Sequence, residues 1–204
     1  MKLYYSPGAC SFSPHIVLRE ANVPFDLVKT DLKAKTTEGG KDFRTVNGAG
    51  YVPALELDDG TVITEGPVIV QYIADQLGGG HLAPPNGTLP RYKLQSWLNF
   101  VSTELHKGFS PLFNPQVTGE SRAALVDRLA ARIGHLDQHL ADKDYIMGKE
   151  FSLPDAYAYT VLNWATPQKV DLSPFKNIVA YMDRISARPS VQAAREAEGL
   201  PPKR

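Results

Sequence analysis

The sequence predicts an α/β domain followed by an all-helical domain, because its hydrophobic periodicity changes once along the chain. Before residue 77, four short β-prone runs alternate with segments of helical period, and Pro, Asp and Gly bound the runs. Between them and the later helices, "LGGGHLAPPNGTLP" is rich in residues that no regular element tolerates. We therefore expect an α/β domain at 1–77, a linker at 78–90 and an all-helical domain at 91–204.

The elements of the first domain follow in a simple order. A strand, a helix and a second strand form a β-α-β unit, and a β-hairpin and a helix come next. The "DDG" at 58–60, between two strand-like runs, is a direct hairpin signal. The expected strands are 2–6, 26–30, 53–57 and 61–64, and the expected helices are 12–21 and 66–77.

The second domain shows only helical spacing. Its first helix, 91–107, carries a core stripe of Leu94, Leu98, Val101 and Leu105. Ser152 and Asp155 have the spacing of a capping box, which begins a helix and does no chemistry. The remaining helices are expected at about 125–140, 153–166, 175–187 and 190–196.

Charge and composition exclude several classes of function. Twenty-two basic residues balance 22 acidic ones and the isoelectric point is about 7.0, so no global field recruits nucleic acid or an anionic membrane. We find no signal peptide and no run near the ~18 apolar residues of a membrane span. A single cysteine cannot form an internal disulfide. We expect a cytoplasmic protein with a small-molecule partner.

Cys10 lies where the first strand ends and the first helix begins. Unpaired helix amides and the helix dipole stabilise a thiolate at such a position, and Ser11 or Ser13 can serve as N-cap. A lone cysteine is more often a buried core residue, but this position favours a reactive thiol. Cys10-x-x-Ser13 also has the spacing of a dithiol redox motif whose second thiol is a hydroxyl. Such a site allows mixed disulfides without internal resolution.

Two further motifs suit a ligand with an amino-acid end. The Val52-Pro53 bond opens a strand, a placement where a cis-proline turns the preceding backbone outward to pair with an extended peptide. Glu65 precedes Gly66, a plausible N-cap, and Pro67 suits the first helical turn. Free amides there hold a carboxylate, and Glu65 holds an ammonium.

Taken together, these motifs resemble those of the glutathione transferases. "YYSPGACS", "YVPALELDDG" and "TEGPVIVQYIAD" are similar to the thioredoxin-like domain of that family, and "ELHKGFSPLF" and "SLPDAY" to its bacterial beta class. The resemblance covers nearly the whole chain. It implies a thioredoxin-like domain, a C-terminal helical domain, a homodimer, and a glutathione site in the interdomain cleft. Glutathione is then a co-substrate, and no cofactor or metal is implied.

The resemblance also implies roles for individual residues. Cys10 contacts the glutathione sulfur, and the Val52 backbone pairs with the cysteinyl unit. Glu65 and Gly66 take the γ-glutamyl end, and Lys35 reaches the glycyl carboxylate. The cleft's second wall is implied to comprise Asn99, Thr103, Glu104, Leu105 and His106.

The first helix of the second domain supplies an independent observation. At ~100° per residue, Tyr92, Asn99, Thr103 and His106 fall on one polar stripe opposite the core stripe. His106 is a candidate for supporting the thiolate or assisting proton transfer. Which of Cys10, Ser11 and His106 dominates thiol activation stays open. The candidate residues of an apolar electrophile pocket, which could equally be core, are Phe109, Phe113 and Trp164.

We therefore expect a glutathione transferase that conjugates hydrophobic electrophiles in detoxification. Two alternatives stay open: a thiol transferase or reductive dehalogenase in which Cys10 itself attacks, and a non-catalytic protein that binds apolar ligands. His135 and His139 have the spacing of a helical metal pair, but no third ligand is evident, which disfavours a metal site.

Overall fold

The computed structural model describes residues 1–201, and within them the N-terminal half forms a mixed five-stranded sheet. The strand order is β3-β2-β1-β4-β5. β1 pairs in parallel with β2 and antiparallel with β4, and β4 and β5 form the predicted hairpin. The strands are β1 (Lys2–Tyr5), β2 (Asp26–Asp31), β3 (Thr36–Thr37), β4 (Ala54–Glu56) and β5 (Val62–Thr64).

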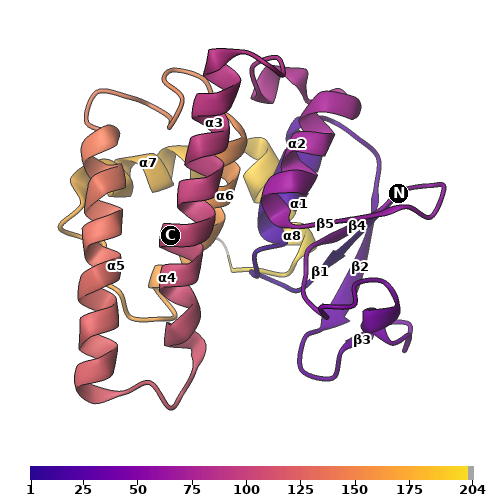
Figure 1. The fold of residues 1–204 in the computed structure, drawn as a ribbon, viewed down its shortest axis with the longest axis horizontal. Coiled ribbons are helices and arrows are strands. Elements are labelled where there is room, and N and C mark those ends of the chain that lie inside the picture. Colours follow the sequence, from indigo (N-terminus) through magenta and orange to yellow (C-terminus); the bar gives the residue numbers. More distant parts are fainter. Residues whose placement is uncertain (202–204) are drawn as a thin grey trace. The chain divides into compact units, whose positions relative to one another are not determined.

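The expected helices of this region are present as α1 (Phe12–Glu20) and α2 (Gly66–Gln76), which pack against each other beside the sheet (Figure 1). α2 buries one apolar face, as its sequence period predicts, whereas α1 is buried on all sides from Phe12 to Leu18. Short 3₁₀ turns occur at Phe43–Thr45 and Gly80–Leu82. The completely buried core residues of the sheet and these helices include Leu3, Ile16, Leu18, Leu55, Ile69 and Ile73.

The strand register brings several chain segments to one end of the sheet. Tyr4 lies opposite Ala54, and Ala54 lies opposite Thr64. The C-terminal end of β1, the N-terminal end of β4 and the C-terminal end of β5 are therefore neighbours. The β2–β3 connection joins them, since Tyr5 pairs with Lys29 near the end of the parallel strand β2. The loops that carry the candidate site residues of the first domain all leave from this end.

The helical half contains one helix run that changes its winding. α3 (Leu89–Phe100) continues into a π-helix (Val101–His106) and then into α4 (Lys107–Phe109). Lys107 donates its amide to Ser102, five residues back, which is the π-helical pattern. A 3₁₀ turn at Ser110–Phe113 follows. The core stripe predicted for this run is buried: Leu94, Leu98, Val101 and Leu105.

The other helices of this half agree with expectation except at one start. α5 (Gly119–His139) begins about two turns earlier than residue 125, because its first turns are polar and show no apolar period. It lies alongside the π-helix and α4 (Figure 1). α6 (Leu153–Leu162) is followed by a 3₁₀ turn (Asn163–Ala165), and α7 (Lys176–Ser186) completes the helical half.

The predicted capping box begins α6. The Ser152 amide donates to the Asp155 carboxylate at 2.8 Å, and the Ser152 hydroxyl donates to it at 2.6 Å. The amide of Ile146 and the hydroxyl of Tyr181 donate to the same carboxylate. Asp155 is completely buried, and burial raises its pKa to about 6 although these donors oppose the shift. This network joins α6, α7 and the 140–152 loop.

The chain divides into two compact units, and the C-terminal segment belongs to the first. One unit combines Met1–Pro85 with the described residues from Arg188 onward, and the other is Asn86–Ala187. We expected the helical domain to extend from residue 91 to residue 204. Residues 202–204 lie outside the described residues. Instead α8 (Pro189–Ala197) packs on α1, where Arg188 and Ser190 bind Glu20.

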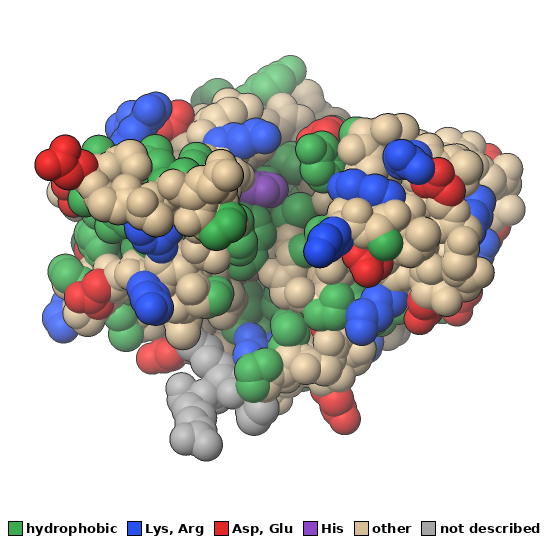
Figure 2. Space-filling view, turned by 90° about the horizontal axis from the view of Figure 1, so that it is seen from below, with side chains coloured by type: hydrophobic (Ala, Val, Ile, Leu, Met, Phe, Trp, Pro, Cys, Tyr) green, Lys and Arg blue, Asp and Glu red, His purple; other side chains and the backbone are tan. Residues whose placement is uncertain are grey.

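The surface shows no concentration of one charge on the face drawn in Figure 2, where Lys and Arg side chains are interspersed with Asp and Glu. This distribution agrees with the balanced sequence charge. Among residues 1–201, no helix combines the length and the apolar character needed to cross a membrane.

Candidate functional site

Cys10 lies beside the backbone of Val52 at the end of the sheet. Its Sγ is 3.1 Å from the Val52 carbonyl oxygen, to which the thiol donates. The Val52-Pro53 peptide bond is cis, as the sequence suggested. Cys10 is partly exposed, whereas Val52 is buried. The structure thus joins two predicted site residues that are 42 positions apart in the chain.

The amides at the start of α1 are arranged differently from the expectation for Cys10. Phe12 and Ser13 donate their amides to the carbonyls of Ala9 and Cys10, and His15 donates to Ser11. Pro14 has no N–H, so the first turn does not offer these donors to the thiol. The amides of Phe12, Ser13 and His15 are therefore not the unpaired donors that we expected, because nearby carbonyls already accept from them.

The two serines near Cys10 are both buried. Ser11 is the N-cap by position, but its hydroxyl pairs with the backbone of Ser6, accepting from the amide at 3.2 Å and donating to the carbonyl at 3.3 Å. Ser13 is 1% exposed. Cys10 is therefore the accessible member of the "CSFS" segment.

Glu65 and Gly66 occupy the start of α2 at the same end of the sheet. Glu65, not Gly66, is the N-cap, and its carbonyl accepts from the amides of Val68 and Ile69, both at 2.9 Å. Gly66 is the first helical residue, whose amide has no intrahelical acceptor, and Pro67 has no N–H. Glu65 is exposed and has a φ of 66°, which a non-glycine residue rarely adopts. The arrangement offers one backbone donor beside one carboxylate.

Lys35 lies in the loop after β2 and is partly buried. Its Nζ donates to the Gly50 carbonyl at 2.8 Å and lies 4.9 Å from the centroid of the Tyr51 ring. Lys35 is therefore not a freely solvated loop lysine. It places a positive charge next to the segment that leads into Val52.

His106 is held inside the helical unit by a residue that the sequence argument missed. Its Nδ1 is 2.6 Å from the hydroxyl of Tyr157, a buried residue of α6. Burial lowers the pKa of His106 to about 4, with a smaller contribution from Lys107. The imidazole is thus neutral at neutral pH, and it can donate or accept a hydrogen bond without carrying charge. Tyr157 follows the capping box of "SLPDAYAY" by two residues, and no local pattern marks its hydroxyl as a partner of His106.

The ring of Trp164 contacts His106 and also contacts two phenylalanine rings. The centroid of Trp164 is 4.9 Å from that of His106, 5.4 Å from that of Phe113 and 6.2 Å from that of Phe109, and each pair is edge to face. Phe113 is 51% exposed and Trp164 is 8% exposed, but Phe109 is completely buried. Phe109 is therefore a core residue that supports Trp164, which corrects its expected place in the lining of a pocket.

The remaining residues that the resemblance implied for the cleft's second wall differ in their surroundings. Asn99 and Thr103 are exposed, and the Thr103 hydroxyl donates to the Asn99 carbonyl at 3.1 Å. Glu104 pairs with Arg132 of α5 at 2.7 Å. The Leu105 side chain is completely buried, so the structure assigns it to the core and corrects its expected contact with ligand.

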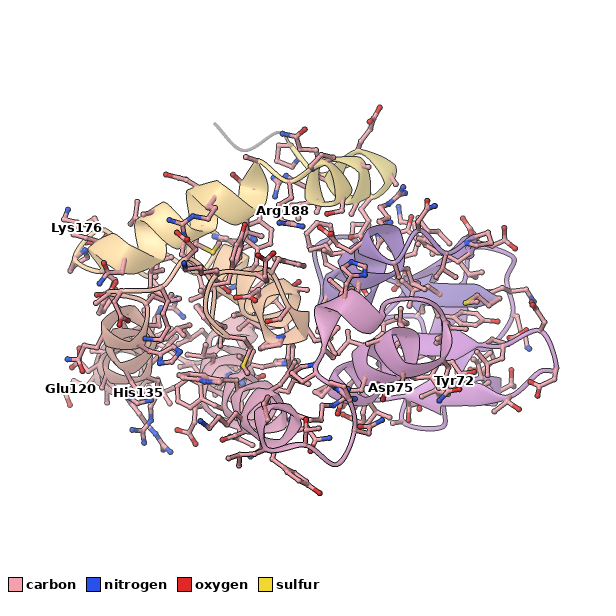
Figure 3. All side chains as sticks on the ribbon, turned by 90° about the horizontal axis from the view of Figure 1, so that it is seen from above. Tyr72, Asp75, Glu120, His135, Lys176 and Arg188 are labelled. Atoms are coloured by element: carbon pink, nitrogen blue, oxygen red, sulfur yellow. The ribbon has the colours of Figure 1, made fainter. Side chains whose placement is uncertain are left out.

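The helical histidine pair packs against a tryptophan. His135, exposed on α5 (Figure 3), and His139 both contact the ring of Trp97, with His139 at 4.2 Å between centroids. The His139 Nε2 lies 2.8 Å from the Ile146 carbonyl oxygen and donates to it. Within residues 1–201, no group of three or more His, Cys, Asp or Glu side chains is placed to hold a metal ion.

Comparison with known proteins agrees with this architecture. Residues 8–76 match the glutathione S-transferase N-terminal domain, and residues 100–189 match the C-terminal domain. Glutathione S-transferase GstA of Escherichia coli O157:H7 is 46% identical over 200 residues, covering 98% of this chain and all of that protein.

Solved structures of glutathione S-transferases are also similar to this chain in fold and sequence. A ternary complex of BphK, a bacterial GST, superposes with a TM-score of 0.95 at 52% identity, covering 98% of this chain and 100% of that one. A beta-class glutathione S-transferase of Sphingomonas chungbukensis gives 0.94 at 49% identity and the same coverage. A sphingomonad glutathione S-transferase complexed with glutathione gives 0.94 at 46% identity, again with the same coverage.

A thioredoxin-like sheet unit joined to a helical unit, with a cysteine in the connection between β1 and α1, is the architecture of the glutathione S-transferase class. The chain belongs to the glutathione S-transferase family. Within that family its structural neighbours include bacterial enzymes, among them one of the beta class.

Proposed function

We propose that this enzyme conjugates the thiol of glutathione to small hydrophobic electrophiles in detoxification. The observation that carries the proposal is the gathering of Cys10, Val52 and Glu65 at one end of the sheet, where the register aligns the ends of β1, β4 and β5. The support from relatives is the likeness to a sphingomonad enzyme whose structure is complexed with glutathione.

In this proposal each end of glutathione has a partner in the first unit. The Val52 backbone pairs with the cysteinyl unit, the Glu65 carboxylate binds the γ-glutamyl ammonium, and the Gly66 amide binds its carboxylate. Lys35 attracts the glycyl carboxylate. The Cys10 thiol, 3.1 Å from the Val52 carbonyl, then lies next to the glutathione sulfur.

The reaction requires the glutathione thiol to lose its proton. The sulfur electron pair forms a carbon–sulfur bond with the electrophile, and either a leaving group departs as an anion or an unsaturated acceptor takes up the released proton. In our proposal the neutral His106 donates a hydrogen bond to the sulfur or relays the proton, and Asn99, Thr103 and Glu104 contact the peptide. Phe113 and Trp164 provide the apolar contacts for the electrophile.

A conjugation assay tests this proposal. Purified protein should couple glutathione to 1-chloro-2,4-dinitrobenzene or to another member of a panel of hydrophobic electrophiles. Asp59 caps the hairpin turn at the far end of β4 and β5, so Asp59→Ala should keep the rate, while Glu65→Ala should raise the KM for glutathione. No conjugation with any electrophile of the panel would overturn the proposal.

A second candidate function uses Cys10 as the nucleophile. The observation that favours it is that the only thiol of the chain is partly exposed, while Ser13, at the resolving position, is buried and has no thiol. The Cys10 thiolate would attack one sulfur of oxidised glutathione and form a mixed disulfide. The other glutathione would leave as a thiolate and take up a proton.

Mass spectrometry of the intact protein tests this second function. Oxidised glutathione should add one glutathionyl group to the wild type and none to Cys10→Ala, and reduced glutathione should remove the group. An unmodified folded protein that reacts after unfolding would exclude the redox reaction. If Cys10→Ala still conjugates electrophiles, Cys10 orients glutathione, and activation falls to His106 and the backbone.

The proposal extends to the assembly, the co-substrate and the location. We propose a homodimer, in keeping with the family, with glutathione as co-substrate and no further cofactor. The exposed apolar residues Tyr51 and Val68 of the first unit and Leu89 and Tyr92 of the second are candidates for the dimer contact. Light scattering should give twice the chain mass of 22.4 kDa. Cell fractionation tests the proposed cytoplasmic location.

A further inference from the structure

A series of hydrogen-bonded polar side chains next to the Cys10 loop, the connection between β1 and α1, takes no part in the proposed reaction. His15 of α1 and Glu198, the residue that caps the C-terminus of α8, form a pair whose side chains are both 0% exposed. The His15 Nδ1 is 2.8 Å from the Glu198 Oε1. The Arg19 Nε donates to the His15 Nε2 at 2.9 Å, and arginine has no acceptor. The proton of the neutral ring is therefore on Nδ1, which donates to the carboxylate.

The second oxygen of Glu198 reaches the loop that carries Cys10. The Gly8 amide donates to the Glu198 Oε2 at 2.9 Å, across 190 positions of sequence. Gly8 has a φ of 68°, and a Cβ at this position would lie 3.4 Å from the Leu200 side chain. The segment after α8 thus binds the loop through Glu198 and packs against it through Leu200.

The two contacts of Glu198 lie on either side of Cys10 in the chain. Gly8 precedes Cys10 by two positions, and His15 follows it on the first turns of α1. A buried carboxylate is costly unless its donors stay in place, so one carboxylate fixes the distance between the loop and the helix. Cys10 lies between these two fixed points, and its Sγ is held at the Val52 carbonyl.

We propose that Glu198 is a positioning residue for the Cys10 loop and, through it, for glutathione binding. The second half of this inference rests on the proposed function. The first half does not, because the geometry of the loop determines the reactivity of Cys10 whether or not glutathione is the ligand.

A competing explanation is that Glu198 only anchors α8 to its unit. The other end of α8 provides a matched control, since Arg188, labelled in Figure 3, binds Glu20 of α1 through its Nε at 2.6 Å. Glu20 is partly buried and its pKa is lowered by the hydrogen bonds from Arg188 and Ser190, although burial, the largest single influence, acts in the opposite direction. Glu20→Gln weakens the docking of α8 without touching Gly8 or His15.

The test compares Glu198→Gln, Glu198→Ala and Glu20→Gln at a temperature well below each melting point. Cys10 is the only thiol, so alkylation by iodoacetamide without glutathione reports on this loop alone. A Gln at 198 cannot accept from both Gly8 and His15, because one of its two terminal atoms is a donor. We expect alkylation of Glu198→Gln to be about fivefold faster than that of the wild type, the scale of one buried hydrogen bond.

The same variants separate positioning from stability. We expect the KM for glutathione to rise about fivefold in Glu198→Gln with little change in kcat, and Glu20→Gln to match the wild type in both assays. If Glu198→Ala does not fold, the isosteric Gln variant carries the test. Equal alkylation rates in Glu198→Gln and the wild type, or equal acceleration in both glutamate variants, would overturn the positioning role. Faster alkylation without any conjugation activity would keep it and reject the proposed function instead.

Discussion

The two compact units hold their candidate residues in different ways. In the sheet unit, the side chains of Cys10, Lys35 and Glu198 bind backbone groups of segments 15 to 190 positions away. In the helical unit, His106 is held by other side chains, namely the Tyr157 hydroxyl and the Trp164 ring. The first arrangement depends on which distant backbone segments the fold brings together, and the second depends on the packing of side chains.

This difference predicts how each unit responds to substitution. A partly exposed side chain bound to a backbone carbonyl, such as that of Lys35, can be removed without opening a cavity, so its loss should change binding more than folding. A side chain inside an aromatic cluster supports its neighbours, so its loss should change both. The variants below test this contrast.

The largest effect is expected at Asp155, which supports α6 two residues before Tyr157. Asp155→Ala removes the acceptor for Ile146 and Ser152 and leaves their amides buried, so the free energy of unfolding should fall by about 3 kcal/mol or more. Urea denaturation measures it. Asp171→Ala, which removes an exposed turn bond to Ser173, is the control and should cost clearly less. Equal losses would show that the buried network adds nothing.

The next effect is expected at Glu65, where the sheet unit should lose binding and keep its fold. Glu65→Ala leaves the γ-glutamyl ammonium unpaired, so glutathione should bind about 2 to 3 kcal/mol more weakly. Calorimetry measures the affinity, and thermal unfolding should stay close to that of the wild type. Equal affinities for the variant and the wild type would remove Glu65 from the site.

A smaller effect is expected from the titration of His106. Its folded pKa of about 4 lies below the unfolded value near 6.5, so protonation favours the unfolded chain, and this stability is present above pH 6.5 and lost as pH falls toward 4. Between pH 7 and 4.5 we expect a loss of about 2 kcal/mol that His106→Gln does not show. Asp155, whose pKa is raised, titrates in the opposite direction in both proteins and cancels in the comparison.

NMR of the imidazole gives a direct reading of the same property. The ring should stay neutral from pH 5.5 to 8. In the conjugation assay, His106→Ala should lower turnover. A titration near pH 6.5 would place His106 in solvent instead of beside Tyr157.

The smallest effect is expected at Lys35. Lys35→Met should weaken glutathione binding by about 1 kcal/mol but leave γ-glutamylcysteine, which lacks the glycyl carboxylate, nearly unaffected. Competition binding with both peptides provides the measurement. An equal loss for the two would mean that Lys35 acts by holding the Gly50 carbonyl and not by binding the ligand.

The sequence was sufficient for most elements and for the sheet end of the site. Short β-prone runs and helix signals placed the strands, α1, α2 and the capping box, since each depends on residues close in the chain. β3 was missed because Thr36 and Thr37 are too few to show a period. The start of α5 was missed because its first turns are polar.

Contacts between distant segments could not be predicted. Nothing in the local pattern indicates that Glu198 meets Gly8, or that the Tyr157 hydroxyl meets His106. The polar stripe of Asn99, Thr103 and His106 assumed an unbroken α-helical period, and the π-helix interrupts it. The burial of Leu105 agrees with the predicted core stripe, and the burial of Phe109 agrees with the core position that the sequence left open beside a place in the pocket.

The π-helix Val101–His106 has a consequence for insertions and deletions. Compared with a regular helix it accommodates one additional residue, and the Lys107 amide therefore binds Ser102 rather than Thr103. Deleting one residue here would remove the bulge and leave a regular α-helix, and the residues that follow would keep their orientation relative to α3. Phe109 would stay in the core. A one-residue deletion in the regular part of α3 would instead turn everything after it by about 100°. The π-helix is therefore the point of this helix run that best tolerates a change of one residue in length, and an aligner should place a one-residue gap here.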